Sequence, residues 1–252
     1  MDIHTIKVVA LDLDGTLTQH KTRLEDKNRK VLDLLGKKYR LLMVGAGECN
    51  RIFMQMNRYP IDIIGNYGLQ YGKYEAASES LVTVFNRSCP CEKDKVTDKI
   101  TKLRKVLGRE QFTGDTVEFH ASGSITFPLL GTGAPLHEKL SFDPDRAIRR
   151  SMYREVADAF PEYRVFIGGS SSFDMAPAPY DKYFALDGFC FGEGLRHENV
   201  LYIGDDYGIG GNDEAVYRSD FPFLPIDDYR DFSSVVADFC PLETAALWQP
   251  ER

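Results

Sequence analysis

The clearest chemical signal in the chain is the pentapeptide Asp12-Leu13-Asp14-Gly15-Thr16, which directly follows the apolar run 8–11. Such a run is typical of a buried parallel strand. Acidic residues that follow a strand lie at the edge where open α/β sheets bind ligands. Two carboxylates in one cleft can divide the work, one as a nucleophile and one as an acid and base. The pattern therefore predicts an enzyme, although two solvated acids in a turn are the simpler alternative.

Further polar residues follow other predicted strands. The turn Gly45-Ala46-Gly47 follows the run 41–44, Asp205 and Asp206 follow the run 200–203, and Lys182 lies between them in the sequence. The carboxyl ends of parallel strands share one edge, so these groups should gather there. Acids held together need a cation, and carboxylate oxygens suit Mg²⁺. Backbone N–H groups in a turn before a helix can hold phosphate oxygens.

Other ligand-binding motifs do not fit the sequence. Gly15 follows Asp14 where an EF-hand would have a third alternating ligand, and no glutamate closes a 12-residue loop. Asn50 occupies the third glycine position of a dinucleotide fingerprint. A Gly-Lys-Ser/Thr phosphate loop is absent, and the spacing of Cys89-Pro90-Cys91 is too short for a zinc knuckle.

The first third and the last quarter of the chain alternate between strand and helix patterns. Thr22 and Glu25 have the spacing of a capping box before a helix with an apolar face. The predicted strands are 8–11, 41–44, 61–64, 200–203 and 223–226, and further helices are predicted at 49–57, 212–219 and 231–239. This alternation predicts an α/β fold with a doubly wound parallel sheet and right-handed crossovers.

The middle of the chain has a different pattern. Helices are predicted at 95–107 and from Asp143-Pro144 onward, and strands at 116–119, 124–127, 164–167 and 172–176. The pattern of one helix followed by two strands occurs twice, which predicts an α+β insert. We therefore expect a core domain of residues 1–81 and 180–252, interrupted by a cap domain of residues 82–179.

Composition limits the classes of function. The 252 residues carry 38 acidic and 31 basic side chains, giving a net charge of −7. This balance argues against a partner that is a nucleic acid or an anionic membrane. No apolar stretch approaches the roughly 20 residues that span a bilayer, and no leader sequence is evident at the N-terminus, so we expect a cytoplasmic protein. The five cysteines are expected to be free thiols.

The order of the motifs resembles that of the haloacid dehalogenase (HAD) superfamily of phosphoryl-transfer enzymes. The eukaryotic-type phosphomannomutases are the most similar group within it. They share the run Asp12 to Thr18, the glycine-rich turn after the second strand, and the tripeptide Tyr180-Asp181-Lys182 in the form Trp-Asp-Lys. The runs Gly168 to Asp174 and Gly210-Gly211-Asn212-Asp213 also match. The resemblance covers nearly the whole chain and implies a HAD-like Rossmannoid core with a cap.

The resemblance also implies residue roles. Asp12 would attack phosphorus and form an aspartyl phosphate, Asp14 would be the acid and base, and Lys182 would neutralise both the nucleophile and the phosphate. Mg²⁺ would be held by Asp12, the Asp14 carbonyl and Asp205. The roles of Asp206, Asn212 and Asp213 stay open. The resemblance and the polar side chains nearby suggest a set of substrate-binding residues: Lys21, Gly45, Ala46, Gly47, His120, Lys139, Ser172 and Asp174.

One part of the resemblance fails. A mutase must hold two phosphates, and this family does so with arginines, whose forked donors suit the distal phosphate. The aligned positions in this chain hold no arginine; they are occupied by Lys21, His120, Thr132 and Lys139. Ser172 and Asp174 do match the pair of the family that contacts the sugar.

These patterns predict a Mg²⁺-dependent phosphohydrolase of a small phosphorylated metabolite, most simply a sugar phosphate. The first alternative is a sugar phosphomutase of the phosphomannomutase type, and the second is a non-catalytic sensor of sugar phosphates. Related mutases often dimerise through the cap, so a homodimer of that kind is a further expectation.

Overall fold

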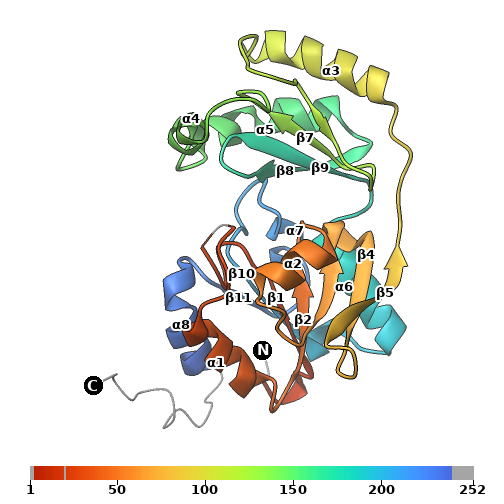
Figure 1. The fold of residues 1–252 in the computed structure, drawn as a ribbon, viewed down its shortest axis with the longest axis vertical. Coiled ribbons are helices and arrows are strands. Elements are labelled where there is room, and N and C mark those ends of the chain that lie inside the picture. Colours follow the sequence, from red (N-terminus) through yellow and green to blue (C-terminus); the bar gives the residue numbers. More distant parts are fainter. Residues whose placement is uncertain (1–2, 20, 240–252) are drawn as a thin grey trace. The chain divides into compact units, whose positions relative to one another are not determined.

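The computed structural model describes residues 3–19 and 21–239, drawn in colour in Figure 1. The chain divides into two compact units. The core unit comprises the described residues of Met1–Asn86, Lys182–Tyr207 and Ala215–Arg252, and the cap unit comprises Arg87–Asp181 and Gly208–Glu214. Each unit is described by itself below.

The core unit is built on a seven-stranded sheet with the order β11-β10-β1-β2-β3-β4-β5. Its central strands β1 (Val8–Leu11), β2 (Arg40–Val44), β3 (Asp62–Gly65), β10 (Val200–Gly204) and β11 (Phe223–Pro225) are parallel. β4 (Gln70–Glu75) and β5 (Ser80–Asn86) extend the sheet as antiparallel strands. The predicted α/β class and its mostly parallel sheet are confirmed, and the antiparallel pair at one edge was not foreseen.

Helices cover both faces of this sheet. Val9 and Leu11 point into an apolar cluster with α1 (Asp26–Leu35), α2 (Cys49–Gln55) and α8 (Phe232–Phe239). Val8 and Ala10 point to the other face, where α6 (Lys182–Glu193) and α7 (Glu214–Tyr217) contribute to a second cluster. Burial on both faces explains why the strand sequences are continuously apolar.

Short 3₁₀ helices complete the core unit: η1 (Ile3–Thr5), η2 (Asn66–Gly68), η3 (His197–Asn199) and η4 (Tyr229–Asp231). The predicted capping box before α1 was wrong. The residue at the N-cap is Glu25, and its side chain makes no capping hydrogen bond. The Thr22 hydroxyl donates to the carbonyl of Gln19 instead, so it belongs to the loop before the helix. The predicted helix at 212–219 is shorter, forming only α7.

The cap unit holds a four-stranded antiparallel sheet with the order β6-β7-β9-β8. Its strands are β6 (Glu118–Phe119), β7 (Ile125–Pro128), β8 (Tyr163–Gly168) and β9 (Ser172–Pro177). Apolar side chains of the sheet form one cluster with α3 (Lys93–Val106) and α5 (Ala147–Ala159). α4 (Leu136–Phe142) is an additional helix that the sequence did not predict.

The start of α5 differs from the prediction, for a local reason. The helix begins at Ala147 and not at Asp143-Pro144. The Asp143 carboxylate nevertheless accepts hydrogen bonds from the backbone amides of Ile148 and Arg149, at 2.9 and 3.0 Å. Asp143 therefore satisfies N-terminal donors of the helix from a position further back in the chain than the usual cap.

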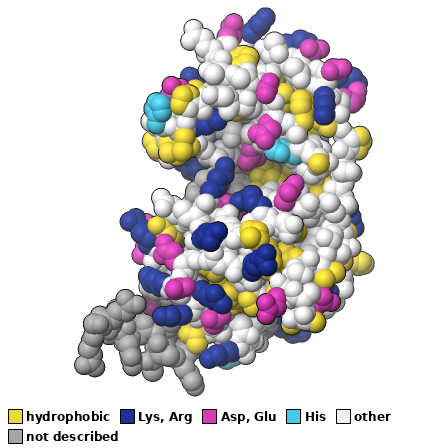
Figure 2. Space-filling view, in the orientation of Figure 1, with side chains coloured by type: hydrophobic (Ala, Val, Ile, Leu, Met, Phe, Trp, Pro, Cys, Tyr) yellow, Lys and Arg dark blue, Asp and Glu magenta, His cyan; other side chains and the backbone are white. Residues whose placement is uncertain are grey.

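The surface and the cysteines agree with the composition. On the face drawn in Figure 2, basic and acidic side chains are intermingled over both units. No helix in the described part of the chain is long and apolar enough to cross a membrane. Cys49, Cys89, Cys91 and Cys190 are free thiols, as predicted, and Cys240 lies outside the described residues.

Candidate active site

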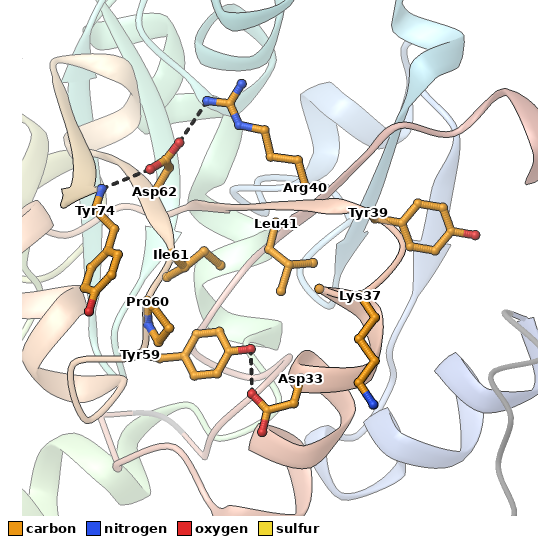
Figure 3. Close-up of a pocket in the computed structure, with 11 residues that line it drawn as sticks. Asp33, Lys37, Tyr39, Arg40, Leu41, Tyr59, Pro60, Ile61, Asp62 and Tyr74 are labelled. Atoms are coloured by element: carbon orange, nitrogen blue, oxygen red, sulfur yellow. Dashed lines mark hydrogen bonds and ion pairs between the residues drawn. The ribbon is translucent and has the colours of Figure 1, made fainter. Parts of the chain in front are cut away.

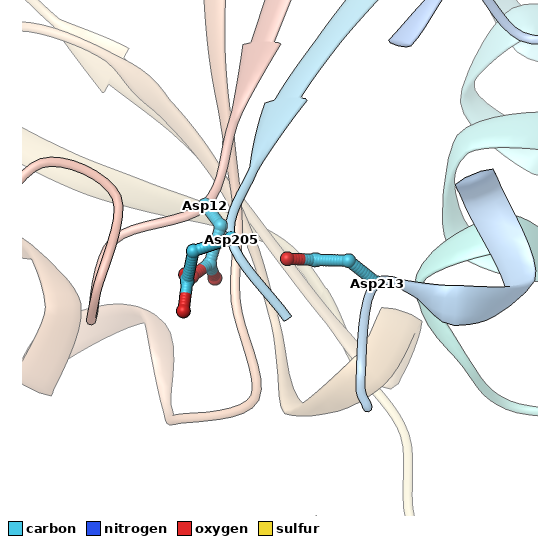
Figure 4. Close-up of side chains that lie close together, drawn as sticks. All are labelled: Asp12, Asp205 and Asp213. Atoms are coloured by element: carbon cyan, nitrogen blue, oxygen red, sulfur yellow. The ribbon is translucent and has the colours of Figure 1, made fainter. Parts of the chain in front are cut away.

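Asp12 and Asp205 lie side by side because their strands are neighbours. β1 pairs with β10 in parallel, with Leu11 opposite Ile203, and each aspartate follows its strand within two residues. A carboxylate oxygen of Asp12 lies within 4.8 Å of one from Asp205. Figure 4 shows both side chains at the ends of these strands. Asp12 is buried and Asp205 is half-buried, so at least the first of the two acids has little access to water.

Lys182 supplies the positive charge at this edge. Its Nζ donates to Oδ1 of Asp12 at 2.6 Å, and the lysine has 0% of its surface exposed. The residue begins α6, which packs on the sheet through Ala185 and Leu186. A lysine is rarely buried completely unless it is paired. This ion pair is therefore a specific feature of the site and not a solvated surface contact.

The turn after β1 holds Asp205 in place. Gly15 has φ +100°, and a Cβ there would lie 2.3 Å from Oδ2 of Asp205. Only glycine fits both the backbone conformation and the close approach. Thr16 then donates its hydroxyl to Oδ1 of Asp205 at 2.8 Å. The Gly-Thr pair of the motif thus orients the second acid.

Asp14 faces residues that the sequence did not single out. Its Oδ1 accepts from the Gln55 side chain at 2.6 Å and from the backbone amide of Lys21 at 2.7 Å. Arg51 places Nη1 3.8 Å from Oδ2 of Asp14 and donates to Gln55 at 2.8 Å. Arg51 and Gln55 are four residues apart on α2, so helical spacing was a usable signal for pairing them. Lys21 approaches Asp14 through its backbone.

The turn Gly45-Ala46-Gly47 follows β2 beside Asp12's strand. The carbonyls of Gly45 and Gly47 accept from the amides of Tyr67 and Asn66, which fixes the turn against the end of β3. Within residues 3–19 and 21–239, the amides of Ala46 and Gly47 donate to no protein acceptor. Two available N–H groups ahead of a helix suit an anionic oxygen.

The donor set at the core edge fits a hard divalent cation. Asp12 and Asp205 offer carboxylate oxygens, and one ammonium group, that of Lys182, pairs with Asp12. Oxygen ligands are those that Mg²⁺ prefers. Figure 4 also draws Asp213, which is fully buried and belongs to the segment Gly208–Glu214 of the cap unit. Asp206 follows Asp205 directly and is half-buried.

The predicted residues of the cap form a polar group on its sheet. Thr126 donates to Oδ1 of Asp174 at 3.0 Å, and Nε2 of His120 lies 3.0 Å from the Thr126 hydroxyl. Ser172 donates to the carbonyl of Gly168 at 3.0 Å. These side chains come from β7, β9 and the turn after β6. Thr126 is the member that the sequence did not single out.

Lys139 lies apart from this group, on α4. Its Nζ donates to the carbonyl of Thr132 at 2.8 Å. Both residues occupy positions where the resemblance expects an arginine, and here they contact each other. Asn212, whose role was left open, lies in the cap segment Gly208–Glu214.

A pocket of about 480 Å³ opens elsewhere on the core unit, at the starts of β2 and β3 (Figure 3). Arg40 and Asp62 form an ion pair of 2.8 Å on its wall, and Tyr59 donates to Asp33 at 3.0 Å. None of the predicted site residues lines it. The candidate site lies at the carboxyl ends of the parallel strands, where such sheets bind ligands. The pocket lies at the amino ends of β2 and β3 and is therefore at the opposite edge of the sheet.

Comparison with known sequences supports the resemblance. The family model for eukaryotic phosphomannomutase matches residues 112–222. The phosphomannomutase of Saccharomyces cerevisiae is 26% identical over 227 residues, which cover 83% of this chain and 84% of the yeast protein. That of Spinacia oleracea is 26% identical over 239 residues, covering 84% of this chain and 87% of the spinach protein.

Solved structures share the fold at lower identity. The N-terminally truncated, IMP-bound IMP-nucleotidase of Plasmodium falciparum has a TM-score of 0.63 and 14% identity, covering 93% of this chain and 68% of that chain. A HAD-superfamily phosphatase of Bacteroides thetaiotaomicron has a TM-score of 0.60 and 14% identity, covering 93% and 94%.

The mostly parallel core sheet, the antiparallel cap sheet and the acidic edge with its buried lysine, together with the matches to phosphomannomutase sequences, identify an enzyme of the HAD superfamily. Within that superfamily, the chain is similar in sequence to the eukaryotic phosphomannomutases, whose family model matches residues 112–222. The resemblance expected from the sequence is confirmed. The relatives favour the mutase alternative over the general phosphohydrolase that the sequence had predicted first.

Proposed function

We propose that this enzyme is a Mg²⁺-dependent sugar phosphomutase of the phosphomannomutase type, which moves a phosphoryl group of a hexose phosphate by way of Asp12. The observation that carries the proposal is the fully buried ion pair of 2.6 Å between Lys182 and Asp12. A carboxylate beside a fixed ammonium group can approach a phosphate dianion, because the lysine offsets the repulsion between the two anions.

Asp12 attacks phosphorus with a carboxylate oxygen, and the bond from phosphorus to the sugar oxygen breaks. Asp14 gives a proton to that leaving oxygen and later takes one from the hydroxyl that attacks the aspartyl phosphate. A proton transfer by a placed side chain accelerates such a step by about 10²–10⁴-fold. The amides of Ala46 and Gly47, together with Lys182, hold the phosphoryl oxygens.

Asp12, Asp205 and the carbonyl of Asp14 are the groups proposed to hold Mg²⁺. When bound, the ion offsets negative charge on the phosphoryl group. Thr16 keeps Asp205 oriented through its 2.8 Å hydrogen bond. Support for these ligands comes from the closeness of the two carboxylates and from the hardness of their oxygens.

The cap residues are proposed to bind the sugar. Ser172 and Asp174 offer hydroxyl and carboxylate groups to sugar hydroxyls, and His120, Lys139 and Lys21 are the candidates for a distal anion. A homodimer through the cap and a cytoplasmic location remain predictions from the sequence.

A phosphatase acting on the same sugar phosphates is the second candidate, and one observation favours it. Where the resemblance expects arginines for a second phosphate, Lys139 contacts the Thr132 carbonyl and His120 contacts Thr126. A lysine is a point charge and does not replace a forked guanidinium. Weak retention of a bisphosphate would let water take the phosphoryl group.

One assay separates the two candidates. The protein and Mg²⁺ are incubated with hexose 1-phosphates and 6-phosphates, mannose among them, with and without a hexose 1,6-bisphosphate. Isomerised sugar phosphate that depends on the bisphosphate supports the mutase. Release of inorganic phosphate without isomerisation supports the phosphatase. If the protein binds sugar phosphates but forms neither product, the remaining candidate is a non-catalytic sensor.

Asp12→Asn tests the shared mechanism. The amide cannot form an aspartyl phosphate, so both activities should fall below detection while the circular dichroism spectrum stays native. Asp94→Asn, in the first turn of α3, is a matched control that should keep full activity. An active Asp12→Asn protein would remove Asp12 from the nucleophile's role.

A further inference from the structure

The helix that begins with Lys182 is intrinsically weak in its second half. α6 contains Gly188 and Gly192, and a Cβ at either position would meet nothing within 4 Å. No close packing therefore requires these glycines, while each lowers helix propensity relative to alanine. Apolar contacts of Leu186 and Phe189 hold α6 on the sheet, but such contacts are not directional.

Among the described residues, the directional contacts of α6 include three that are spread along the helix. Lys182 binds Asp12 at the start of the helix, and Glu193 binds Arg40 at the end, at 2.8 Å. In the middle, Asp187 binds Nε2 of His197 at 3.0 Å. Asp187 directly precedes the first of the two glycines, at the point where the helix needs support.

His197 is held by two carboxylates at once. Its Nδ1 lies 2.6 Å from Oδ1 of Asp220, and its ring is stacked on Phe221 with centroids 3.9 Å apart. A carboxylate only accepts hydrogen bonds, so both ring nitrogens must carry a proton to satisfy Asp187 and Asp220 together. The geometry therefore selects the imidazolium form of the ring.

We propose that His197 is a positioning residue for phosphoryl transfer, whose charged ring ties α6 to the segment before β11 and thereby keeps Lys182 on Asp12. This role rests on the proposed function of the site. Asp187 lies five residues from Lys182, about 7.5 Å along the helix axis. Loss of the ring proton releases one carboxylate. The first half of α6, which carries the lysine and is followed by the weak half with its two glycines, then loses its directional contact at Asp187.

The groups around His197 set the direction of its pH dependence. Tyr183, Asp187 and Cys190 face the region from α6, and Asp220 faces it from the other side. Burial lowers the pKa of His197, but the hydrogen bonds and charges of Asp220 and Asp187 outweigh it, so the net shift is upward. The charged ring therefore persists to higher pH than that of an ordinary histidine and is lost as the solution becomes more basic.

The test compares kcat of the wild type and His197→Gln from pH 6 to pH 9, with Mg²⁺ and a hexose phosphate that the wild type turns over. At pH 6 the variant should be about 10-fold slower, within the roughly 100-fold that a 1 Å misplacement can cost. The two rates should converge at high pH, where the wild-type ring has lost its proton. A ratio that stays constant with pH, or equal rates throughout, would overturn the proposal.

Two further variants sharpen this test. His197→Arg keeps a permanent charge and donors for both carboxylates, so its kcat at low pH should be maintained up to pH 9. A kcat equal to that of His197→Gln at every pH would count against the positioning role of His197. His137→Gln, on α4 of the cap unit, is the matched control and should follow the wild type at every pH.

A measurement without turnover distinguishes this inference from the proposed function. In ¹⁵N NMR of the wild type at pH 6.5, both ring nitrogens of His197 should have the shifts of an imidazolium. Amide hydrogen exchange at fixed pH should be faster for residues 182–187 in His197→Gln. Both results with no activity on any sugar phosphate would sink the proposed function alone. A neutral ring of His197, or unchanged amide exchange, would contradict only the positioning role of His197.

Discussion

Replacing Lys182 by methionine should be far more damaging than replacing a surface lysine. Nζ and Oδ1 of Asp12 are 2.6 Å apart, and at an effective dielectric constant of about 20 this separation corresponds to roughly 6 kcal/mol of attraction. Desolvation offsets part of that gain. Removing one partner of a buried pair leaves the other charge uncompensated and costs about 3–5 kcal/mol.

The charges around the Lys182–Asp12 pair determine how much each variant should be destabilised. Lys182→Met leaves the carboxylate of Asp12 within 4.8 Å of that of Asp205 and without its ammonium partner. Asp12→Asn leaves the ammonium group of Lys182 buried without that carboxylate, so both single variants should be destabilised. The double variant should be less destabilised than the sum of the two single variants, because each removes the same interaction.

The free energy of unfolding is measured by urea titration in Mg²⁺-free buffer, followed by far-UV circular dichroism. Lys102→Met on the exposed side of α3 is the control, expected within about 0.5 kcal/mol of wild type. The turnover of Lys182→Met should fall by about 10²–10³-fold, the effect of removing a group that stabilises developing charge. An unfolding free energy for Lys182→Met equal to that of Lys102→Met would refute the reasoning.

Three other changes test the cap and the turn after β1. Asp143→Ala should destabilise the cap by about 3–5 kcal/mol, because Arg149 is buried and bonded to that carboxylate at 2.8 Å. Burial opposes ionisation of Asp143, but hydrogen bonds from Arg149 outweigh it and lower the pKa of Asp143 below its ordinary value of 3.8. This contribution to stability is therefore complete above pH 3.8 and is lost as the pH falls through the lower pKa that Asp143 has in the folded protein. Acid unfolding of the wild type and of Asp143→Ala measures the difference. Thr16→Val should weaken Mg²⁺ binding about 10–100-fold in a calorimetric titration, since Asp205 loses the hydroxyl that orients it; unchanged affinity would contradict that role. Gly15→Ala should be poorly folded or inactive, because a Cβ there would lie 2.3 Å from Asp205; a native thermal midpoint with full activity would show that the turn can relax.

The sequence alone sufficed where the signal was local. The apolar run before Asp12 predicted a strand covered on both faces, and the acids after it were predicted to lie at the ligand-binding edge of the sheet. The order of the motifs also identified the superfamily, because the acids, the glycine-rich turn and the lysine of its active site follow one another along the chain in a fixed order. Helix ends were less secure: Glu25 and Arg146 occupy N-cap positions without side-chain capping, so no residue type marked them.

Tertiary structure decided the contacts that join distant segments. Arg51 and Gln55 reach Asp14 only because α2 packs beside the turn after β1, and the sequence between them fixes no such approach. The pairing of His197 with Asp187 and Asp220 likewise depends on how α6 lies on the sheet. Residue type and spacing determine which elements form and at which end of a strand a polar group falls. Packing between those elements then determines which side chains come into contact. A buried charge needs a partner, and the only groups available to it are those that the fold brings close.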